Sequence, residues 1–274
     1  MASINTNVGA MIALQNLEAI SGALRTTQNR ISTGLKVASA KDDGATWAIA
    51  QSQRATVNSL DAVKASLSRG SSVIDIALSA GTSVSDLLSE LKEKALAASD
   101  TSLDTASRLA LTSDFTSIRD QITKTLSNAS FNGINLLDGS RSSLTALANA
   151  QGTSRMTVAA QDMSLGGSIV TLGATAGFAT ATSAANLLTT IDSSINNVSA
   201  ALARLGTGSK ALDSHLTFIG KLQDSLTEAI GNMVDADMAR ESTKLQALQI
   251  KQQLAIQALS IANQSSSYLL SLFR

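Results

Sequence analysis

Two long stretches of the chain carry apolar residues at alternating spacings of three and four, the pattern of helices that pack along a seam. The stretch over 188–233 is interrupted only by Ser209 and Gln223. The stretch over 60–98 has no interruption, and its seam positions are Leu60, Val63, Leu67, Gly70, Ile74, Ala77, Gly81, Val84, Leu88, Leu91, Ala95 and Ala98. Glycine within a helix costs about 1 kcal/mol relative to alanine. Because the register continues through Gly70 and Gly81, we expect a partner helix to come close there.

Three further helices are predicted. Residues 107–129 place Leu111, Phe115, Ile118, Ile122 and Leu126 on one face. The same three-four spacing runs over 13–31 at the N-terminus and over 245–262 at the C-terminus. The C-terminal helix carries a second apolar face, made by Ile250, Leu254 and Ile261. A helix with two apolar faces needs more than one neighbour.

The segment over 131–182 breaks the helical pattern. Asn132-Gly133 and Asp138-Gly139 are dipeptides typical of hairpin turns. Residues 155–161 alternate, with Met156 and Val158 on one face, and 166–173 has the composition of another short strand. We therefore expect a small β-containing excursion.

Composition supports a helical chain and argues against several functions. None of the 274 residues is proline, which is disfavoured inside helices. Acidic and basic residues both number 21, so no net field directs the chain to nucleic acid or an anionic membrane. Cysteine is absent, which excludes disulfides and thiolate metal sites. The start has no basic region before Arg25, and no apolar run is long enough to cross a membrane. The fold class expected is mainly α, with long antiparallel helices in a rod-like coiled-coil bundle, a small β-hairpin region, and both termini helical and paired.

The two ends cannot satisfy each other fully. Ordering a residue costs about 1–2 kcal/mol, and burying a large aliphatic side chain returns about 1.5–3 kcal/mol. If the two ends only paired with each other, each would bury one apolar stripe, and the free energy gained by burial would not offset the cost of ordering the residues. We predict that they are disordered in the monomer and fold when other copies of the chain surround them.

Several motifs resemble bacterial flagellin, the subunit of the flagellar filament. They are "SINTNVGAM" at the start, "RISTGLKVASAKDDGATWAIAQS" over 30–52, "FNGINLLDG" over 131–139 and "SLFR" at the end. The resemblance implies a filament-core domain made from residues 1–40 and 235–274. It implies a bundle domain made from 41–182, with the hairpin and variable excursion over about 131–182, and from the long helix over 183–234.

The resemblance also assigns roles to residues. Filament-core self-assembly residues would be Ile4, Val8, Ile12, Leu17, Ile20, Leu24, Ile31, Leu35, Leu245, Leu248, Leu254, Leu259, Ile261, Leu269, Leu272 and Phe273. The joint between the domains would contain Lys41, Asp42, Asp43, Asp235 and Asp237, with Lys41 pairing with an acid across it.

The resemblance further implies how the chain reaches its place. The unfolded chain would be exported by the flagellar type III apparatus and act outside the cell in swimming motility. Its partners would be other copies of itself or sister flagellins, the filament cap, the hook-junction proteins, and an export chaperone at the C-terminal helix over 244–274. Only about 40 residues, over 140–181, stand where many flagellins insert outer domains, so a thin filament is expected.

Some flagellins are detected by an animal innate immune receptor through a basic and leucine-rich helix face. In the alignment on "LSELKEKALAASD", Glu90 replaces an arginine and Lys94 replaces a leucine of those members. Charge reversal at a contact costs several kcal/mol, so we predict weak or absent recognition.

The sequence gives only weak signals for a catalytic, cofactor or metal site. His215, the only histidine, lies beside Leu216 of the long seam, which favours a packing role. "GTGSK" over 206–210 lacks the spacing of a phosphate loop. Asp235, Asp237 and Glu241 fail the EF-hand pattern and are better suited to starting the last helix. No enzyme, cofactor, metal, nucleic acid or membrane insertion is expected. The alternatives left open are a hook-filament junction protein and a secreted type III coiled-coil translocator.

Overall fold

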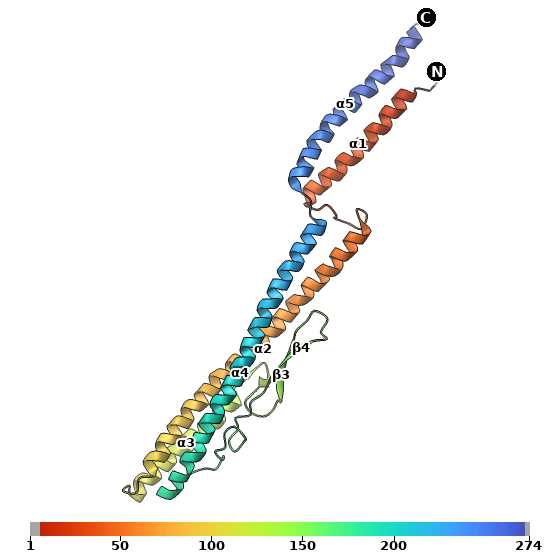
Figure 1. Cartoon of the computed structure of the whole chain (residues 1–274). Coiled ribbons are helices and arrows are strands. Elements are labelled where there is room, and N and C mark those ends of the chain that lie inside the picture. Colours follow the sequence, from red (N-terminus) through yellow and green to blue (C-terminus); the bar gives the residue numbers. More distant parts are fainter. Residues whose placement is uncertain (1–5, 272–274) are drawn as a thin grey trace. The chain divides into compact units, whose positions relative to one another are not determined.

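The computed structural model describes residues 6–271, with side chains described over 6–264. The chain divides into two compact units. One comprises the described parts of Met1–Ala55 and Ser225–Arg274, and the other is Thr56–Asp224. Two long helices, α2 (Gly44–Ala98) and α4 (Ala181–Val234), contribute residues to both units. The fold-class prediction is confirmed: the chain is mainly helical, with antiparallel long helices, paired terminal helices and small β-hairpins (Figure 1).

In the unit Thr56–Asp224, α2 and α4 run antiparallel and pack along the predicted seams. All twelve seam positions of α2 are buried. An added Cβ at Gly81 would lie 2.6 Å from Cδ2 of Leu202, and one at Gly70 would lie 3.4 Å from Cδ1 of Leu212. The prediction of close helix approach at both glycines is therefore confirmed. Polar pairs on the flanks, such as Lys92 with Asp192 at 2.6 Å, follow the same register.

The third helix, α3 (Thr105–Asn128), begins at the N-cap Asp104, whose side chain accepts from the N–H of Ser107. Its predicted apolar face is buried at Phe115, Ile118, Ile122 and Leu126. The ring of Phe115 meets that of Phe178 edge to face, with centroids 5.1 Å apart. This contact joins α3 to the chain segment that leads into α4.

Two hairpins follow α3. Strands β1 (Ser130–Phe131) and β2 (Ile134–Asn135) pair around Asn132-Gly133, where φ is 50° and 73°. The turn predicted from this dipeptide is confirmed. Strands β3 (Ser143–Leu147) and β4 (Arg155–Ala159) pair antiparallel (Figure 1). Leu144 lies opposite Val158 in this ladder.

The strand predicted over 166–173 is wrong. Val170 and Leu172 are buried while Thr171 is exposed, so alternating burial produced the strand-like pattern. The backbone does not pair with a strand here. The N–H of Thr171 donates to Oγ of Ser194 on α4 at 3.1 Å, and the side chain of Asn197 donates to the carbonyl of Ile169 at 3.2 Å. Hydroxyl and amide groups on α4 thus take the place of a neighbouring strand.

Candidate functional site

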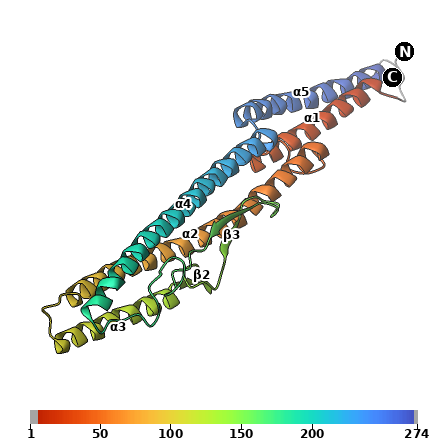
Figure 2. The same cartoon turned by 60° about the horizontal axis from the view of Figure 1, so that its bottom comes forward.

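The candidate site is the antiparallel pair formed by α1 (Val8–Thr33) and α5 (Met238–Ser271), which lie side by side in both views (Figures 1 and 2). Helix α1 begins at Asn7, whose Oδ1 accepts from the N–H of Ala10 at 3.0 Å. It ends at Gly34, where φ is 71° and the N–H donates to the carbonyl of Arg30. Helix α5 begins after Asp237, whose carboxylate accepts from the N–H of Arg240 at 3.1 Å.

The seam between the two helices is only partly covered. Predicted residues on α1 that face it are half-buried: Leu17, Ile20, Leu24 and Ile31. On the α5 side of the seam, Leu245 and Leu259 are half-buried and Leu248 is buried, with 8 % exposure. Leu35 is half-buried in the loop after α1. In the Thr56–Asp224 unit, by contrast, most comparable seam positions are fully buried.

The other predicted residues lie away from the seam or outside the described side chains. The exposed fractions are 61 % for Val8, 54 % for Ile12, 58 % for Leu254 and 68 % for Ile261. Met11, Leu14, Ile250 and Ile256 are also exposed. We call these eight residues the outer face. Leu269 belongs to α5, but its side chain is outside the described set, as are Ile4, Leu272 and Phe273.

An open groove of about 600 Å³ runs along the pair. Its lining is mostly apolar and small, and includes Ile12, Ala13, Ile20, Leu254, Ala255 and Ala258. From residue 252 to 273 the chain contains no Asp, Glu, Lys or Arg. This part of α5 can therefore be covered by apolar surface without burying a charge of its own.

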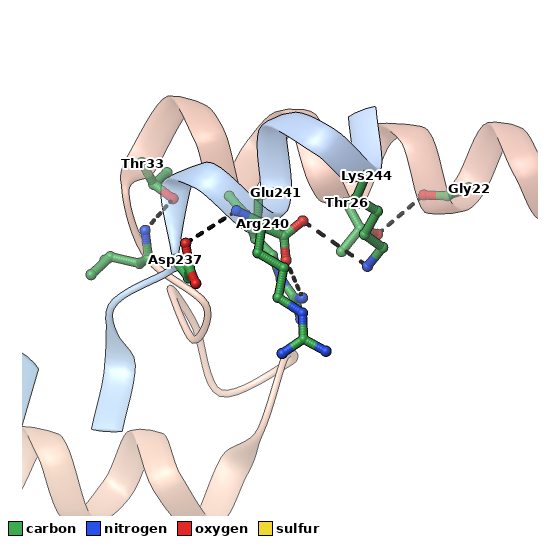
Figure 3. A network of polar contacts seen from close by, with 9 residues as sticks. Gly22, Thr26, Thr33, Asp237, Arg240, Glu241 and Lys244 are labelled. Atoms are coloured by element: carbon green, nitrogen blue, oxygen red, sulfur yellow. Dashed lines mark hydrogen bonds and ion pairs between the residues drawn. The ribbon is translucent and has the colours of Figure 1, made fainter. Parts of the chain in front are cut away.

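A polar cluster holds the opposite end of the pair. Nη1 of Arg30 lies 3.1 Å from Oε1 of Glu241, whose exposed fraction is 8 %. Lys244 lies one turn further along α5, with Nζ 4.0 Å from Oε2 of Glu241 (Figure 3). Burial by itself raises the pKa of Glu241, but the hydrogen bond from Arg30 and the charge of Lys244 bring that pKa below its ordinary value. Thr27, fully buried beside this carboxylate, lowers the same pKa.

The acids predicted for a joint act as caps of turns and helices. Oδ2 of Asp42 accepts hydrogen bonds from the N–H groups of Ala38 and Ser39. The bonds from Ser39 are the main cause of the lowered pKa of Asp42. The carboxylate of Asp43 accepts hydrogen bonds from the hydroxyl of Thr46 at 2.7 Å and from its N–H, at the start of α2. These bonds, the hydroxyl bond most of all, lower the pKa of Asp43.

Backbone bonds join the two loops that contain these acids. Leu35 and Asp235 form an antiparallel bridge, and the N–H of Ala236 donates to the carbonyl of Gly34 at 2.9 Å. Lys41 forms no ion pair with any residue in the described range, so the predicted pairing across the loops is not observed.

The remaining candidates lie in the Thr56–Asp224 unit. Nε2 of His215 lies 2.8 Å from the carbonyl of Ala148, and its ring stands 5.7 Å from that of Phe218. Residues 206–210 stay helical, and Val158 of β4 packs against Gly208. Glu90 is exposed on α2, and Nζ of Lys94 lies 3.7 Å from Oδ2 of Asp114.

Two contacts of the candidate site were not found from the sequence. They are the bond from Asn7 to α5 and the pairing of Arg30 with Glu241. Each of these residues lies among other polar residues near a helix end, so the sequence carries no signal for its distant partner. Within the described residues there is no cluster of three or more potential metal ligands, and no helix has the length and hydropathy of a membrane span.

Comparisons with known proteins agree with the fold. Residues 4–142 match the model of the bacterial flagellin N-terminal helical region, and 188–273 match that of the C-terminal helical region. The chain is 59 % identical to flagellin FljM and 60 % identical to flagellin FljK of Caulobacter vibrioides, each over 99 % of this chain and 98 % of the relative. It is 37 % identical to a flagellin of Brucella melitensis over the full length of both chains.

A crystal structure of Bacillus cereus flagellin shares the fold. Its TM-score is 0.51 and its identity 21 %, and the match covers 56 % of this chain and 88 % of that one. None of the comparisons favours a junction protein or a translocator. The chain therefore belongs to the bacterial flagellins, the structural subunits of the flagellar filament.

Proposed function

We propose that the α1–α5 pair forms the inner core of the filament and that neighbouring copies cover its outer face. The observation that carries the proposal is the exposure of eight large apolar side chains on a pair with few charges. Covering a half-exposed aliphatic side chain contributes about 1 kcal/mol, so the outer face supplies on the order of 8 kcal/mol per subunit before ordering costs. Such a surface is unfavourable in a monomer and favourable in a polymer.

The proposal assigns roles to both parts of the chain. The core residues named from the sequence would act on the seam and on the outer face, and the loops over 34–43 and 235–237 would join the core to the bundle. In this division residues 1–40 and 235–274 form the core layer, and 41–182 and 183–234 form the surrounding layer. The pair would be disordered in the monomer and become ordered on assembly.

The proposal also covers the route to the filament. The chain would be exported unfolded through the flagellar type III apparatus, after a chaperone has bound the C-terminal helix over 244–274. It would add to the filament below the cap, above the hook-junction proteins, and beside sister flagellins. Its work would be mechanical, in swimming motility, and no residue would have a catalytic role.

A test compares charge insertion on and off the outer face. Ile261→Asp places a carboxylate on α5 where the exposed fraction is 68 %, and Leu96→Asp is the matched control on α2 with 58 % exposure. Neither substitution disturbs a buried contact of the monomer. Burying the new charge at position 261 between copies costs several kcal/mol.

Polymerisation is seeded with short filament fragments and followed by negative-stain electron microscopy. A chain lacking 1–35 and 240–274 serves as the negative reference. We expect filaments from the full chain and from Leu96→Asp, and none from Ile261→Asp. Normal filaments from Ile261→Asp would show that the outer face stays in water, and the proposal would fail.

A further inference from the structure

The part of the α1–α5 interface near the termini is lined mainly by small side chains, which do little to fix its register. Ala255, Ala258 and Ala262 recur at a spacing of three and four along α5 and line one groove with Gly9 and Ala13 of α1, where Gly9 contacts Ala262. A slide of one helical turn therefore replaces alanine by alanine. Small side chains that repeat in this way leave register weakly specified, as flat and repetitive interfaces do.

Asn7 makes a directional contact at the free end of the pair. Its Oδ1 accepts from the N–H of Ala10 at 3.0 Å, while its Nδ2 donates to the carbonyl of Ala262 at 2.8 Å. One amide thus caps α1 and attaches that cap to a single position on α5. Among the usual N-cap residues, Asn alone offers an acceptor and an amide donor at once.

Arg30 and Glu241 make the second directional contact. Glu241 is 8 % exposed and Thr27 beside it is fully buried, and Arg30 at 3.1 Å is the closer of its two cationic partners, the other being Lys244 of the same helix at 4.0 Å. A slide of one turn in either direction separates the two charges and leaves a carboxylate with little water and no guanidinium. Removing one partner of a buried pair is costly for that reason.

The two contacts agree on a single register. Gly9 faces Ala262, so that a Cβ added at Gly9 would lie 3.9 Å from Cβ of Ala262, and Arg30 contacts Glu241. From Gly9 to Arg30 on α1 and from Ala262 to Glu241 on α5 the separation is 21 residues, or about 32 Å at the helical rise, and Asn7 reaches Ala262 from two residues before Gly9. Twenty-one residues are also three heptads, after which the same helix face returns to the seam. The observed register makes both contacts together, and a slide of one turn would separate both.

We propose that Asn7 and the Arg30–Glu241 pair are positioning residues that fix the axial register of α1 against α5, and so align the two halves of the outer face for neighbouring copies. The partner of this surface is a second copy of the chain. The inference rests on the proposed function, because register has consequences only if the outer face is an assembly surface.

The absence of cysteine permits a direct test of register. The pair Gly9→Cys with Ala262→Cys reports the observed register, because the 3.9 Å Cβ separation suits a disulfide. The pair Gly9→Cys with Ala258→Cys reports a slide of one turn. Filaments are oxidised mildly and dissociated, and intramolecular product is separated from dimers on a non-reducing gel.

The substitutions at Asn7, Arg30 and Glu241, which we call the clamp variants, change the two directional contacts. Asn7→Asp retains a good N-cap, removes the amide donor and places a carboxylate beside the carbonyl of Ala262, and Gln28→Ala, an exposed site on α1, is the control. At the other end, Arg30→Glu and Glu241→Arg are made singly and together. The double variant restores opposite charges, so a role in register predicts its partial rescue.

We expect the 9–262 product to exceed the 9–258 product in the parent and in Gln28→Ala. Asn7→Asp should lower that ratio about 2- to 12-fold, the range for one neutral hydrogen bond. Arg30→Glu should lower it about tenfold or more, and the double charge swap should recover most of the loss. An unchanged ratio in the clamp variants, or disulfides formed mainly between copies, would overturn the inference.

A separate label distinguishes this failure from failure of the proposed function. Ile256→Cys lies on the outer face and has no role in register. Protection of this cysteine from a bulky maleimide in filaments, with an unchanged cross-link ratio, removes only the inference. Full labelling in filaments removes the proposed function itself.

Discussion

Gly206 and Gly208 lie two residues apart on α4, and alanine should stabilise the chain at Gly206 but not at Gly208. Alanine in place of glycine within a helix stabilises by about 1 kcal/mol. An added Cβ at Gly206 meets no atom within 4 Å, so Gly206→Ala should gain this full amount. At Gly208 the new Cβ would lie 2.6 Å from Cγ1, 3.1 Å from Cγ2 and 3.4 Å from Cβ of Val158.

Val158 cannot turn aside easily. It is β-branched, only 8 % exposed and part of the β3–β4 ladder. Overpacking of this kind costs about 1–3 kcal/mol, so Gly208→Ala should be neutral or destabilised by up to about 2 kcal/mol. The two variants should therefore differ by about 1–3 kcal/mol, or about 2–12 °C in Tm for a unit of this size.

Thermal unfolding of the monomer, followed by circular dichroism, measures the difference. Adding Val158→Ala to Gly208→Ala removes the obstructing methyl groups and should recover part of the loss relative to Val158→Ala alone. If Gly208→Ala proves as stable as Gly206→Ala, then β4 does not rest on this helix and the reasoning is refuted.

Four further outcomes are expected. Leu88→Ala, at a fully buried seam position, should destabilise the monomer by about 2–5 kcal/mol in urea titrations, whereas Leu96→Ala, 58 % exposed, should stay within about 0.5 kcal/mol. Gly133→Ala, where φ is 73°, should cost about 1–2 kcal/mol in the same titrations because alanine disfavours this conformation. Because the pKa of Glu241 is lowered in the folded chain, its carboxylate adds stability above the ordinary carboxyl pKa, and this stability is lost as the pH falls through the lowered pKa. Light scattering should therefore show that Glu241→Gln filaments are weaker at neutral pH but less sensitive to acid. Lys94→Leu combined with Glu90→Arg should raise innate-receptor signalling above that of the parent chain, and equal signalling would contradict the alignment.

The periodic parts of the fold could be predicted from the sequence because helices repeat. The seam of α2 was found position by position, and its two glycines were correctly assigned to close helix approach. The Asn132-Gly133 turn was also predictable, because few dipeptides adopt positive φ at both positions. In each case a local rule is enough, since the same steric constraint acts on every chain.

Contacts between distant segments could not be predicted in the same way. The strand-like run over 166–173 carries the right alternation, but its hydrogen-bond partners are side chains of α4 rather than another strand. Likewise, nothing local distinguishes Asn7 or Arg30 from other polar residues in a helix. Their partners lie 255 and 211 residues away in the sequence, and only the tertiary structure brings them together.

The two units contain the same three-four repeat but differ in how far it is buried, and the number of neighbouring elements explains the difference. Helix α2 meets α4, and the hairpins close over them, so its seam from Leu60 to Ala98 is covered within one chain. In the part of the chain that the structure describes, helix α1 packs mainly against α5, and the same spacing leaves its seam half-buried and the outer face in water. The repeat therefore identifies which residues face a partner, while the count of available partners decides whether one chain suffices. In the α1–α5 pair the count falls short, and the absence of charge over 252–273 supports the proposal that the same helices of other subunits supply the missing neighbours.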